Sequence, residues 1–216
     1  MRSNCGQAGD YLFIFKLFIS LVVKLKNVYN MIMKNYSFKT RLLNINLILQ
    51  KANIKEGYTV ADLGCGKFGH FSFLAAKRVG SHGKVYAVDI MKANLEMIKK
   101  EAKASNLENI KTIWSDLEIL KATKIDSNSV DLIFLINVLH ESKQPLKIIA
   151  EALRMMKTSA KLIIVDWEKI AAPLGPKKEL RVDKNFLKAG AQKLGLYLEE
   201  ELEAGQYHFG LIFTKP

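Results

Sequence analysis

Residues 60–70, Val-Ala-Asp-Leu-Gly-Cys-Gly-Lys-Phe-Gly-His, decide the fold of this chain. A short apolar run ends in an acid, and three glycines then follow in the spacing Gly-x-Gly-x-x-Gly before a helical pattern begins. A strand that stops at such a turn lets the backbone approach a ligand closely, and the next helix points its free N–H groups at that ligand. A second acid, Asp89, ends the next apolar run. Strand, glycine loop, helix and acid together give the context that a dinucleotide-type binding motif requires.

Residues 60–66 resemble the first motif of class I S-adenosylmethionine-dependent methyltransferases. In that family an acid lies two residues before the first glycine, as Asp62 does here, whereas nicotinamide-binding Rossmann proteins usually have an apolar residue there. The family usually has its third glycine at the position of Phe68, but this chain has Phe68 followed by Gly69. The resemblance covers about residues 60–216, so it implies a methyltransferase fold for most of the chain.

Length, charge and cysteine content bound the class of protein. The 216 residues are enough for one domain with a sizeable core. The 33 Lys and Arg exceed the 21 Asp and Glu, which gives a net charge of +12. This excess is diffuse and mostly Lys, which favours a solvated surface over a nucleic-acid site. The only cysteines are Cys5 and Cys65, which excludes a disulfide scaffold and a cysteine zinc site, predicts no metal, and fits a reducing cytoplasm.

The N-terminal part differs in composition from the rest. Residues 1–33 form a hydrophobic, basic extension, and we expect the methyltransferase domain to occupy residues 34–216. The most apolar run, residues 11–23, is interrupted by Lys16. It falls short of the roughly 18 uncharged apolar residues expected of a spanning helix. The extension therefore does not have the pattern of a transmembrane segment.

Three interpretations of this extension stay open. Residues 11–26 can be a basic amphipathic anchor on a membrane surface, which would make the otherwise cytoplasmic protein membrane-associated. They can also be a helix that packs on a partner or covers the active site. Alternatively, the extension is absent from the working protein because translation begins at Met31 or Met33. The sequence does not choose between them, and it gives no oligomeric state.

Strand and helix patterns alternate from residue 59 onward. We expect strands at 59–62, 84–89, 110–115, 130–136, 161–166, 196–202 and 208–214, and helices at 39–51, 71–79, 93–104, 146–156 and 184–194. Such alternation predicts a parallel sheet with right-handed crossovers. The last two strands are joined by only a few residues and must therefore be antiparallel. The predicted fold is α/β: a Rossmann-like, doubly wound, seven-stranded and mainly parallel sheet with a C-terminal antiparallel hairpin, as in the methyltransferase family.

The resemblance implies S-adenosylmethionine as the cofactor, bound outside the carboxyl ends of the strands. Asp89, 20 residues after Gly69, would accept hydrogen bonds from the ribose diol, or else would cap the next helix. Ile90 would cover one face of the adenine. Asp116 and Leu117 lie where the family contacts the adenine amino group, although Asp116 can also be a plain turn acid at a strand end.

Further cofactor contacts are implied around the glycine loop. Gly64, Cys65 and Gly66 would lie along the methionine portion, and Asp62 would order the loop and help hold the ammonium group. Asn137, which follows the fourth strand, would bind the same side of the cofactor. Cys65 is expected to be a small loop filler, because thiol and metal chemistry usually need partner residues.

Residues 137–141, Asn-Val-Leu-His-Glu, resemble the apolar-His stretch of small-molecule methyltransferases, including the ubiquinone/menaquinone-biosynthesis type. The family places substrate-facing groups at this point. His140 is therefore the candidate general base for a substrate O–H or N–H, and the alternative is a histidine that caps or packs at a helix start. Trp167, which follows Asp166 at the end of the fifth strand, either stacks on a flat substrate or plugs the edge of the sheet.

The turn-rich connection at residues 171–178 has the composition of a functional lid. It resembles the Gly-Pro-containing loop of the same small-molecule group. Lys177, Lys178 and Arg181 either bind an anionic substrate or belong to a solvated linker.

The sequence predicts an S-adenosylmethionine-dependent methyltransferase that moves a methyl group to a small-molecule acceptor by in-line displacement. One alternative is an RNA or protein methyltransferase. Residues 136–139, Ile-Asn-Val-Leu, are not the Asn-Pro-Pro-Tyr-like run that would favour base or amide nitrogen chemistry. The other alternative is a non-catalytic Rossmann-like binding module. Binding of the sulfonium cofactor separates this module from both enzymes.

Overall fold

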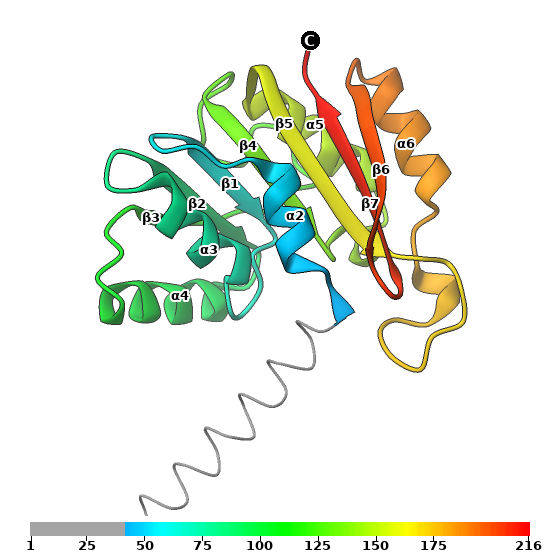
Figure 1. The fold of residues 1–216 in the computed structure, drawn as a ribbon, viewed down its shortest axis with the longest axis horizontal. Helices are drawn as coiled ribbons and strands as arrows, with labels where there is room; N and C mark the ends of the chain where they lie inside the picture. Colours follow the sequence, from blue (N-terminus) through cyan, green and yellow to red (C-terminus); the bar gives the residue numbers. More distant parts are fainter. Residues whose placement is uncertain (1–41) are drawn as a thin grey trace, which may run out of the picture. The chain divides into compact units, whose positions relative to one another are not determined.

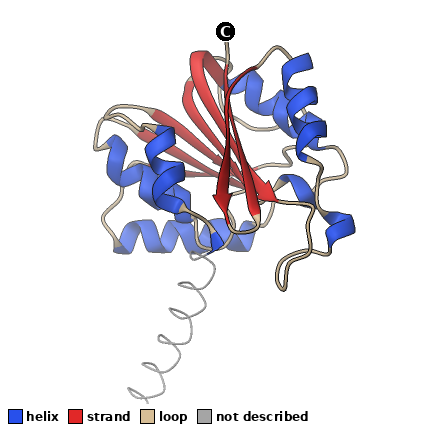
Figure 2. Ribbon diagram, turned by 45° about the vertical axis from the view of Figure 1, so that its right-hand side comes forward, coloured by secondary structure: helices blue, strands red, loops and turns tan. Residues whose placement is uncertain are grey.

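The computed structural model describes residues 42–216, which form one seven-stranded sheet with helices on both faces (Figures 1 and 2). The strand order is β3-β2-β1-β4-β5-β7-β6. The strands are β1 (Thr59–Leu63), β2 (Lys84–Asp89), β3 (Ile110–Trp114), β4 (Val130–Ile136), β5 (Met156–Trp167), β6 (Tyr197–Gly205) and β7 (His208–Thr214). The described helices are α2 (Ile45–Ala52), α3 (His70–Val79), α4 (Lys92–Ala104), α5 (Pro145–Met155) and α6 (Lys184–Lys193), with short 3₁₀ turns η1 (Leu139–Glu141) and η2 (Lys178–Leu180).

The predicted fold class is confirmed. β1 pairs in parallel with β2 and β4, and the pairs β2–β3 and β4–β5 are parallel as well. β7 is antiparallel to both of its neighbours, β5 and β6. Only residues 206–207 separate β6 from β7, which is far too short for the crossover that a parallel pair needs. In Figure 1 the hairpin of β6 and β7 closes one side of the sheet.

The central strands are buried on both faces, which explains their near-continuous apolar sequences. In β4, Leu132 and Phe134 pack on one face with residues of α2 and α3. Ile133 and Leu135 point to the opposite face and pack with residues of α5 and α6. Successive side chains of a strand alternate between the faces, so an unbroken apolar run serves two cores. The two cores hold rigid the strand ends that carry the candidate site.

The first described helix is shorter than the pattern predicted. The apolar stripe predicted a helix over residues 39–51, but α2 begins at Ile45. The side chain of Asn44 accepts a hydrogen bond from the backbone N–H of Leu47 at 3.1 Å and so caps the helix there. Residues 39–41 lie outside the described part of the chain. A local capping residue therefore sets the boundary that periodicity alone misplaced.

The fifth strand is longer than predicted and begins earlier. β5 starts at Met156, which pairs with Val130, and the register then shifts before the pairing resumes at Lys161. Ser159 lies within this irregular part with a left-handed φ of 62°. The polar residues 157–159 gave no strand signal in the sequence, because this part of the strand is half-exposed and irregular rather than alternating.

The predictions for the N-terminal extension, residues 1–33, and for membrane contact through residues 11–26 lie outside the described residues. Within residues 42–216, none of the helices combines the length and the apolar character needed to cross a membrane.

Candidate cofactor and active site

The candidate site lies at the topological switch point, outside the carboxyl ends of β1 and β4. After β3 the chain crosses to the other side of β1, so the connections that leave β1 and β4 run in opposite directions. Gly64 follows β1 and Val138 follows β4, and the two residues meet. A Cβ atom added to Gly64 would lie 2.3 Å from Cγ2 of Val138. The glycine loop and residues 137–141 therefore converge, as the sequence predicted.

The glycine loop is tied to β2 and leaves open space beside Gly66. Gly64 and Gly66 have left-handed φ values of 75° and 64°. The N–H groups of Gly64 and Cys65 both donate to the carbonyl of Val88, at 2.8 and 3.0 Å. No described atom lies within 4 Å of the position that a Cβ of Gly66 would occupy. A ligand can therefore approach the backbone closely at this point.

The third glycine belongs to the helix rather than to the loop. Gly69 is the N-cap of α3, with a left-handed φ of 50°. A Cβ atom there would lie 3.0 Å from Cδ1 of Ile98 on α4. Phe68, at the family's usual glycine position, is 43% exposed. The chain thus keeps a glycine where α3 packs closely on α4 and places a large exposed side chain in the preceding turn.

Asp89 ties three structural elements together through its buried carboxylate. Oδ2 accepts from the N–H of Gly66 at 2.8 Å. Oδ1 accepts from the N–H of Met91 at 2.7 Å and from Nδ2 of Asn94 at 3.2 Å. Asp89 therefore does help to cap α4, since Met91 is the N-cap residue of this helix and Asn94 lies in its first turn. Each carboxylate oxygen offers about two lone pairs, so Oδ2 retains one for a ligand hydroxyl.

Asp62 is buried beneath the loop and faces the start of α3. Its Oδ2 accepts from Oγ of Ser72 at 2.6 Å, and both residues are at most 3% exposed. Burial raises the pKa of Asp62 to about 6, and the nearby charge of Asp89 adds to this rise. Burial, with the charges of Asp62 and Asp89, also raises the pKa of the Cys65 thiol well above its usual range. Cys65 therefore stays a neutral thiol, as expected of a loop filler rather than a nucleophile.

Asn137 places a buried acceptor atom at the switch point. It follows β4 with a left-handed φ of 56°, which is uncommon outside glycine and costs about 1 kcal/mol. Its backbone N–H donates to the carbonyl of Val165 at 2.8 Å. Its side-chain Oδ1 is buried and has no hydrogen-bond partner in the described part of the chain. A buried polar atom without a partner is rare in folded proteins and marks a position where a ligand group fits.

His140 and Asp166 form a hydrogen-bonded pair beside Asn137. Nδ1 of His140 lies 2.7 Å from Oδ1 of Asp166, and the backbone N–H of His140 donates to Oδ2 at 3.1 Å. Oδ1 also accepts from the N–H of Trp167 at 2.8 Å. Asp166 is fully buried, whereas the His140 side chain is 11% exposed. The candidate base is thus held from β5 by a carboxylate that the sequence analysis left unpaired.

Arg181 organises the predicted lid and is not available to a substrate. It is 4% exposed, and its guanidinium donates to the backbone carbonyls of Glu168, Ile170, Leu174 and Pro176 at 2.8–3.1 Å. Its Cζ also lies 5.2 Å from the centre of the Trp167 ring. The interpretation of Arg181 as an anion-binding residue is therefore wrong, because loop carbonyls already occupy its donors.

Trp167 is packed rather than presented to a substrate. Its indole is 8% exposed and lies 4.1 Å from the His208 ring, centre to centre. A Cβ atom on Gly175 would come within 2.6 Å of the indole, so the lid loop also presses directly on it. Of the two interpretations left open, the one in which Trp167 plugs the sheet agrees with this burial.

The adenine-side residues separate into exposed and buried ones. Oδ1 of Asp116 accepts from the N–H of Glu118 at 2.9 Å, so Asp116 does form a turn. Leu117 is 8% exposed and packs in the core, which leaves its backbone rather than its side chain for a ligand. Ile90 is 56% exposed, and its carbonyl accepts from Nε1 of Trp114 at 2.8 Å. Ile90 and Asp116 therefore remain accessible beside the ends of β2 and β3.

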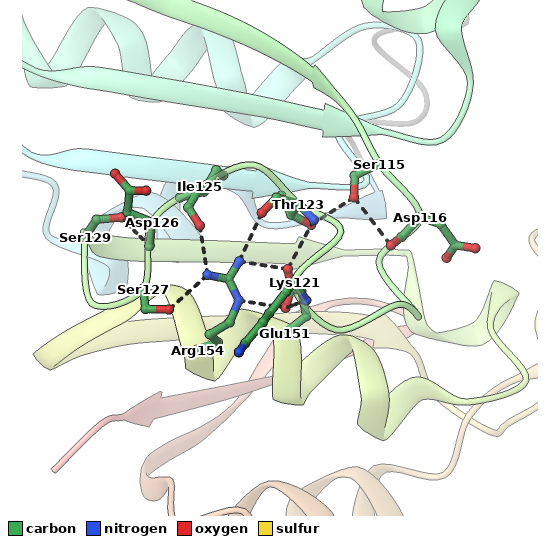
Figure 3. Close-up of polar contacts among 10 residues, drawn as sticks. All are labelled: Ser115, Asp116, Lys121, Thr123, Ile125, Asp126, Ser127, Ser129, Glu151 and Arg154. Atoms are coloured by element: carbon green, nitrogen blue, oxygen red, sulfur yellow. Dashed lines mark hydrogen bonds and ion pairs between the residues drawn. The ribbon is translucent and has the colours of Figure 1, made fainter.

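A buried ion pair on α5 fixes the loop that carries Asp116 (Figure 3). Glu151 is fully buried and accepts two hydrogen bonds from Arg154, at 2.8 and 2.9 Å. Its carboxylate also accepts from the backbone N–H groups of Lys121 and Thr123. Arg154 donates to the carbonyls of Thr123 and Ile125. Hydrogen bonds from Glu151 and Arg154 thus attach the long connection between β3 and β4 to α5, and we call this ion pair with its backbone partners the clip.

We expect Glu151→Ala to lower the free energy of unfolding by about 3–5 kcal/mol, because it leaves the charge of Arg154 without its carboxylate partner and two backbone N–H groups without acceptors. Thermal unfolding measures this loss. The matched control is Glu96→Ala, which breaks the exposed pair with Lys99 at the same three-residue spacing and should cost less than about 1 kcal/mol. Equal losses in the two variants would contradict the structural role of the clip.

The same clip predicts a pH dependence of stability. Burial acts to raise the pKa of Glu151, but the hydrogen bonds from Arg154 and from the N–H of Lys121 outweigh it and lower the pKa below 4.5. A lowered carboxyl pKa contributes stability above the unfolded value, and this contribution is lost as the pH falls through the folded value. The difference in stability between the wild type and Glu151→Ala should therefore shrink as the pH falls below 4.5, which unfolding curves at decreasing pH measure.

Sequence reasoning missed three of the residues that shape the site. Ser72 donates a hydrogen bond to Asp62. It was missed because the helix was predicted from its apolar residues alone. Glu151 and Arg154 carried one available signal, an acid and a base three residues apart on an otherwise apolar helix face. Asp166 was noticed as the end of the fifth strand, but its pairing with His140 was not predicted.

Comparison with known proteins identifies the family. A family model described as a methyltransferase domain matches residues 54–203, which is more than half of the chain. The chain belongs to this family. The predicted resemblance to S-adenosylmethionine-dependent methyltransferases is therefore confirmed, together with the enzyme class and cofactor that it implies at the level of the family.

This methyltransferase domain is similar to a solved S-adenosylmethionine-dependent methyltransferase from Aquifex aeolicus, with 29% identity and a TM-score of 0.73. That match covers 82% of this chain and 92% of the other. Over 161 residues it is 26% identical to the ubiquinone/menaquinone biosynthesis C-methyltransferase UbiE of Bordetella parapertussis, covering 71% of this chain and 60% of that protein. Over 121 residues it is 29% identical to (S)-tetrahydroprotoberberine N-methyltransferase of Eschscholzia californica, covering 56% and 32%. The matched regions span less than two thirds of these two curated relatives.

Proposed function

We propose that this methyltransferase domain binds S-adenosylmethionine and transfers its methyl group to a small-molecule acceptor. The observation that carries the proposal is the convergence of the glycine loop, Asp89 and Asn137 at the switch point of the sheet. Two of the relatives are named as methyltransferases of quinone biosynthesis and of an alkaloid, which supports a small acceptor. No feature of the described residues specifically favours RNA, protein or a non-catalytic role. We also propose residues 34–216 as the extent of the domain.

The residues at the switch point fit the chemistry of this cofactor. The buried Oδ1 of Asn137 has no partner among the described residues and can accept a hydrogen bond from the cofactor's ammonium group. The free lone pair on Oδ2 of Asp89 suits a ribose hydroxyl. The open space at Gly66 leaves room for the methionine chain along residues 64–66. Two acceptor atoms and an open stretch of backbone are thus present in one place.

The remaining assignments follow the positions of the strand ends. Ile90, exposed beyond β2, would cover the adenine, and the free carboxylate oxygen of Asp116 would accept from its amino group. Asp62 would order the loop through Ser72 and add negative charge near the ammonium. When bound, the cofactor supplies an electrophilic methyl group on a sulfonium. The chain itself then has to orient the acceptor, exclude water and receive a proton.

Calorimetry with the full chain tests the proposal. S-adenosylmethionine should bind at one site with micromolar affinity, whereas NADH should not bind. The discriminating feature is Asp62, an acid where nicotinamide-binding proteins usually have an apolar residue. Binding of NADH without binding of S-adenosylmethionine would contradict the proposed function.

The raised pKa of Asp62 predicts how this binding depends on pH. Burial raises the pKa of Asp62 to about 6, so most of the carboxyl is protonated at pH 5 and ionised at pH 7. Only the ionised form attracts the ammonium group, so the affinity for S-adenosylmethionine should rise by up to about tenfold between these values. Calorimetry across this range measures the effect. Asp62→Asn should bind more weakly with a flat profile, and an unchanged slope in this variant would assign the dependence to another group.

A further inference from the structure

The His140–Asp166 pair fixes which imidazole nitrogen carries the proton. A carboxylate can only accept hydrogen bonds, so the 2.7 Å contact places the proton on Nδ1 of His140. The second oxygen of Asp166 accepts from the backbone N–H of the same residue at 3.1 Å. The ring and its backbone are thus held by the two oxygens of one buried side chain. This arrangement leaves the lone pair on Nε2.

Nε2 is the free end of the pair. Within residues 42–216 it makes no hydrogen bond and lies 4.0 Å from Oε1 of Glu141, whose side chain is 76% exposed. The His140 side chain retains 11% of its exposure, whereas Asp166 retains none. A histidine needed only for packing gains nothing from a basic nitrogen left without a donor. The arrangement is that of a general base whose ring is held by Asp166 and whose Nε2 can accept a proton.

The position of His140 places this base at the switch point. It lies three residues after Asn137, whose unpartnered Oδ1 marks the cofactor side of the site. Between them, Val138 touches Gly64 of the glycine loop, and Leu139 is buried in the core. The backbone from β4 to His140 is therefore held in place by Val138 and Leu139, and Asp166 holds the imidazole itself.

We propose that Asp166 is a positioning residue that holds His140 as the proton acceptor for methyl transfer, and that the acceptor substrate is therefore a small molecule with an O–H or N–H group. This inference rests on the proposed function. The acceptor's lone pair forms a bond to the methyl carbon while its proton passes to Nε2 of His140. The electron pair of the broken C–S bond stays on sulfur, so the positive charge moves from the sulfonium to the imidazolium, which then releases the proton to water.

Three charged groups face the imidazole and set its basicity. Burial lowers the pKa of His140, and Arg181 from the lid loop lowers it too. The hydrogen bond and charge of Asp166 on β5, with the charge of Glu141 on η1, outweigh both and raise the pKa above 6.5. Methyl transfer should therefore increase as the pH rises through this raised pKa, because only the neutral imidazole accepts a proton.

Nitrogen-15 NMR of the full chain, labelled at histidine and bound to S-adenosylhomocysteine, tests the pair without any acceptor. We expect His140 to carry its proton on Nδ1 when neutral, and its pKa to fall by about 1–3 units in Asp166→Asn. The matched control is Asp131→Asn. Asp131 pairs with Lys157 and with the N–H of Thr59 at the opposite end of β4, so its loss should leave His140 unchanged. The opposite tautomer, or an unshifted pKa in Asp166→Asn, would overturn the proposal.

If Asp166→Asn fails to fold, His140→Gln carries the test. This variant should bind S-adenosylmethionine within about twofold of the wild type and lose about 100-fold or more in kcat, which is the usual contribution of a general base. Equal losses in cofactor affinity and kcat would indicate a structural role instead.

The acceptor class is tested by the atom that receives the label. The full chain is incubated with S-adenosylmethionine carrying a carbon-13 methyl group and with the small-molecule extract of the cells that make it. Carbon-13 NMR should show methyl groups bound to oxygen or nitrogen, and methyl bound to carbon or sulfur would overturn the acceptor class. Failure to bind S-adenosylmethionine would instead contradict the proposed function. The tautomer measurement would then still test whether Asp166 positions His140.

Discussion

Replacing Asp89 with alanine is expected to weaken the binding of S-adenosylmethionine by about 100-fold or more. A hydrogen bond to a charged group contributes about 1.5–3 kcal/mol, which is about 10- to 150-fold in affinity, and the proposed role gives Asp89 one such bond to a ribose hydroxyl. The variant also leaves the N–H groups of Gly66 and Met91 without their acceptor, so the loop that receives the cofactor loses its tie to β2. Calorimetry well below the unfolding temperature measures the loss of affinity.

A second variant separates the ligand contact from the structural one. Asn94→Ala removes one donor to Oδ1 of Asp89 but leaves the carboxylate in place. We expect it to lower stability by less than about 1 kcal/mol and the affinity by less than about threefold. Comparable losses in Asn94→Ala and Asp89→Ala would mean that Asp89 acts only as a cap of α4, and near wild-type affinity in Asp89→Ala would exclude the ribose assignment.

The sequence predicted the fold well because its signals were local and repeated. Strand patterns separated by helical ones require a parallel sheet, and the short turn before His208 requires an antiparallel partner. The site could be located for the same reason, since the acids and glycines at strand ends such as Asp62 and Asp89 must meet at one edge of a parallel sheet. Boundaries were less certain where a cap or an irregular register decides, as at Asn44 and Ser159.

The partners of these residues could not be predicted, because they depend on contacts between distant segments. His140 and Asp166 are 26 positions apart, and Lys121 and Glu151 are 30 apart. Only the register of β4 against β5 brings the first pair together. A charged residue such as Arg181 reads as a surface group in the sequence, and only the four carbonyls around it in the structure reveal a buried organiser of the lid.

The departure at Phe68 has a consequence for how the loop is built. With the third glycine moved to Gly69, the left-handed turn coincides with the N-cap of α3. Such a cap has no side chain to satisfy the first N–H groups of the helix. The buried side chain of Asp62 contacts the first turn of α3 by accepting a hydrogen bond from Oγ of Ser72. The buried acid therefore supports α3 at the point where the loop ends, which links the loop's shape to the family's characteristic acid.

Gly64 and Gly66 should respond very differently to the same added methyl group. In Gly64→Ala the new Cβ would lie 2.3 Å from Cγ2 and 3.0 Å from Cγ1 of Val138, a β-branched side chain with little freedom to rotate. Overpacking and a left-handed φ together should lower the free energy of unfolding by about 2–5 kcal/mol. In Gly66→Ala no described atom is within 4 Å, so only the backbone cost of about 1 kcal/mol remains.

The two variants should differ in the opposite way in cofactor binding, because Gly66→Ala affects affinity more than stability. Gly66→Ala should keep a near-native unfolding temperature yet lose about tenfold or more in affinity for S-adenosylmethionine, because its Cβ fills the space left for the ligand. Gly64→Ala should lose stability first, and Val138→Ala should recover part of it, since the two close Cγ atoms are then gone. A double-mutant cycle of unfolding free energies measures this coupling. Additive losses at Gly64 and Val138 would show that the loop and the segment after β4 do not meet, and the switch-point site proposed here would then lose its geometric basis.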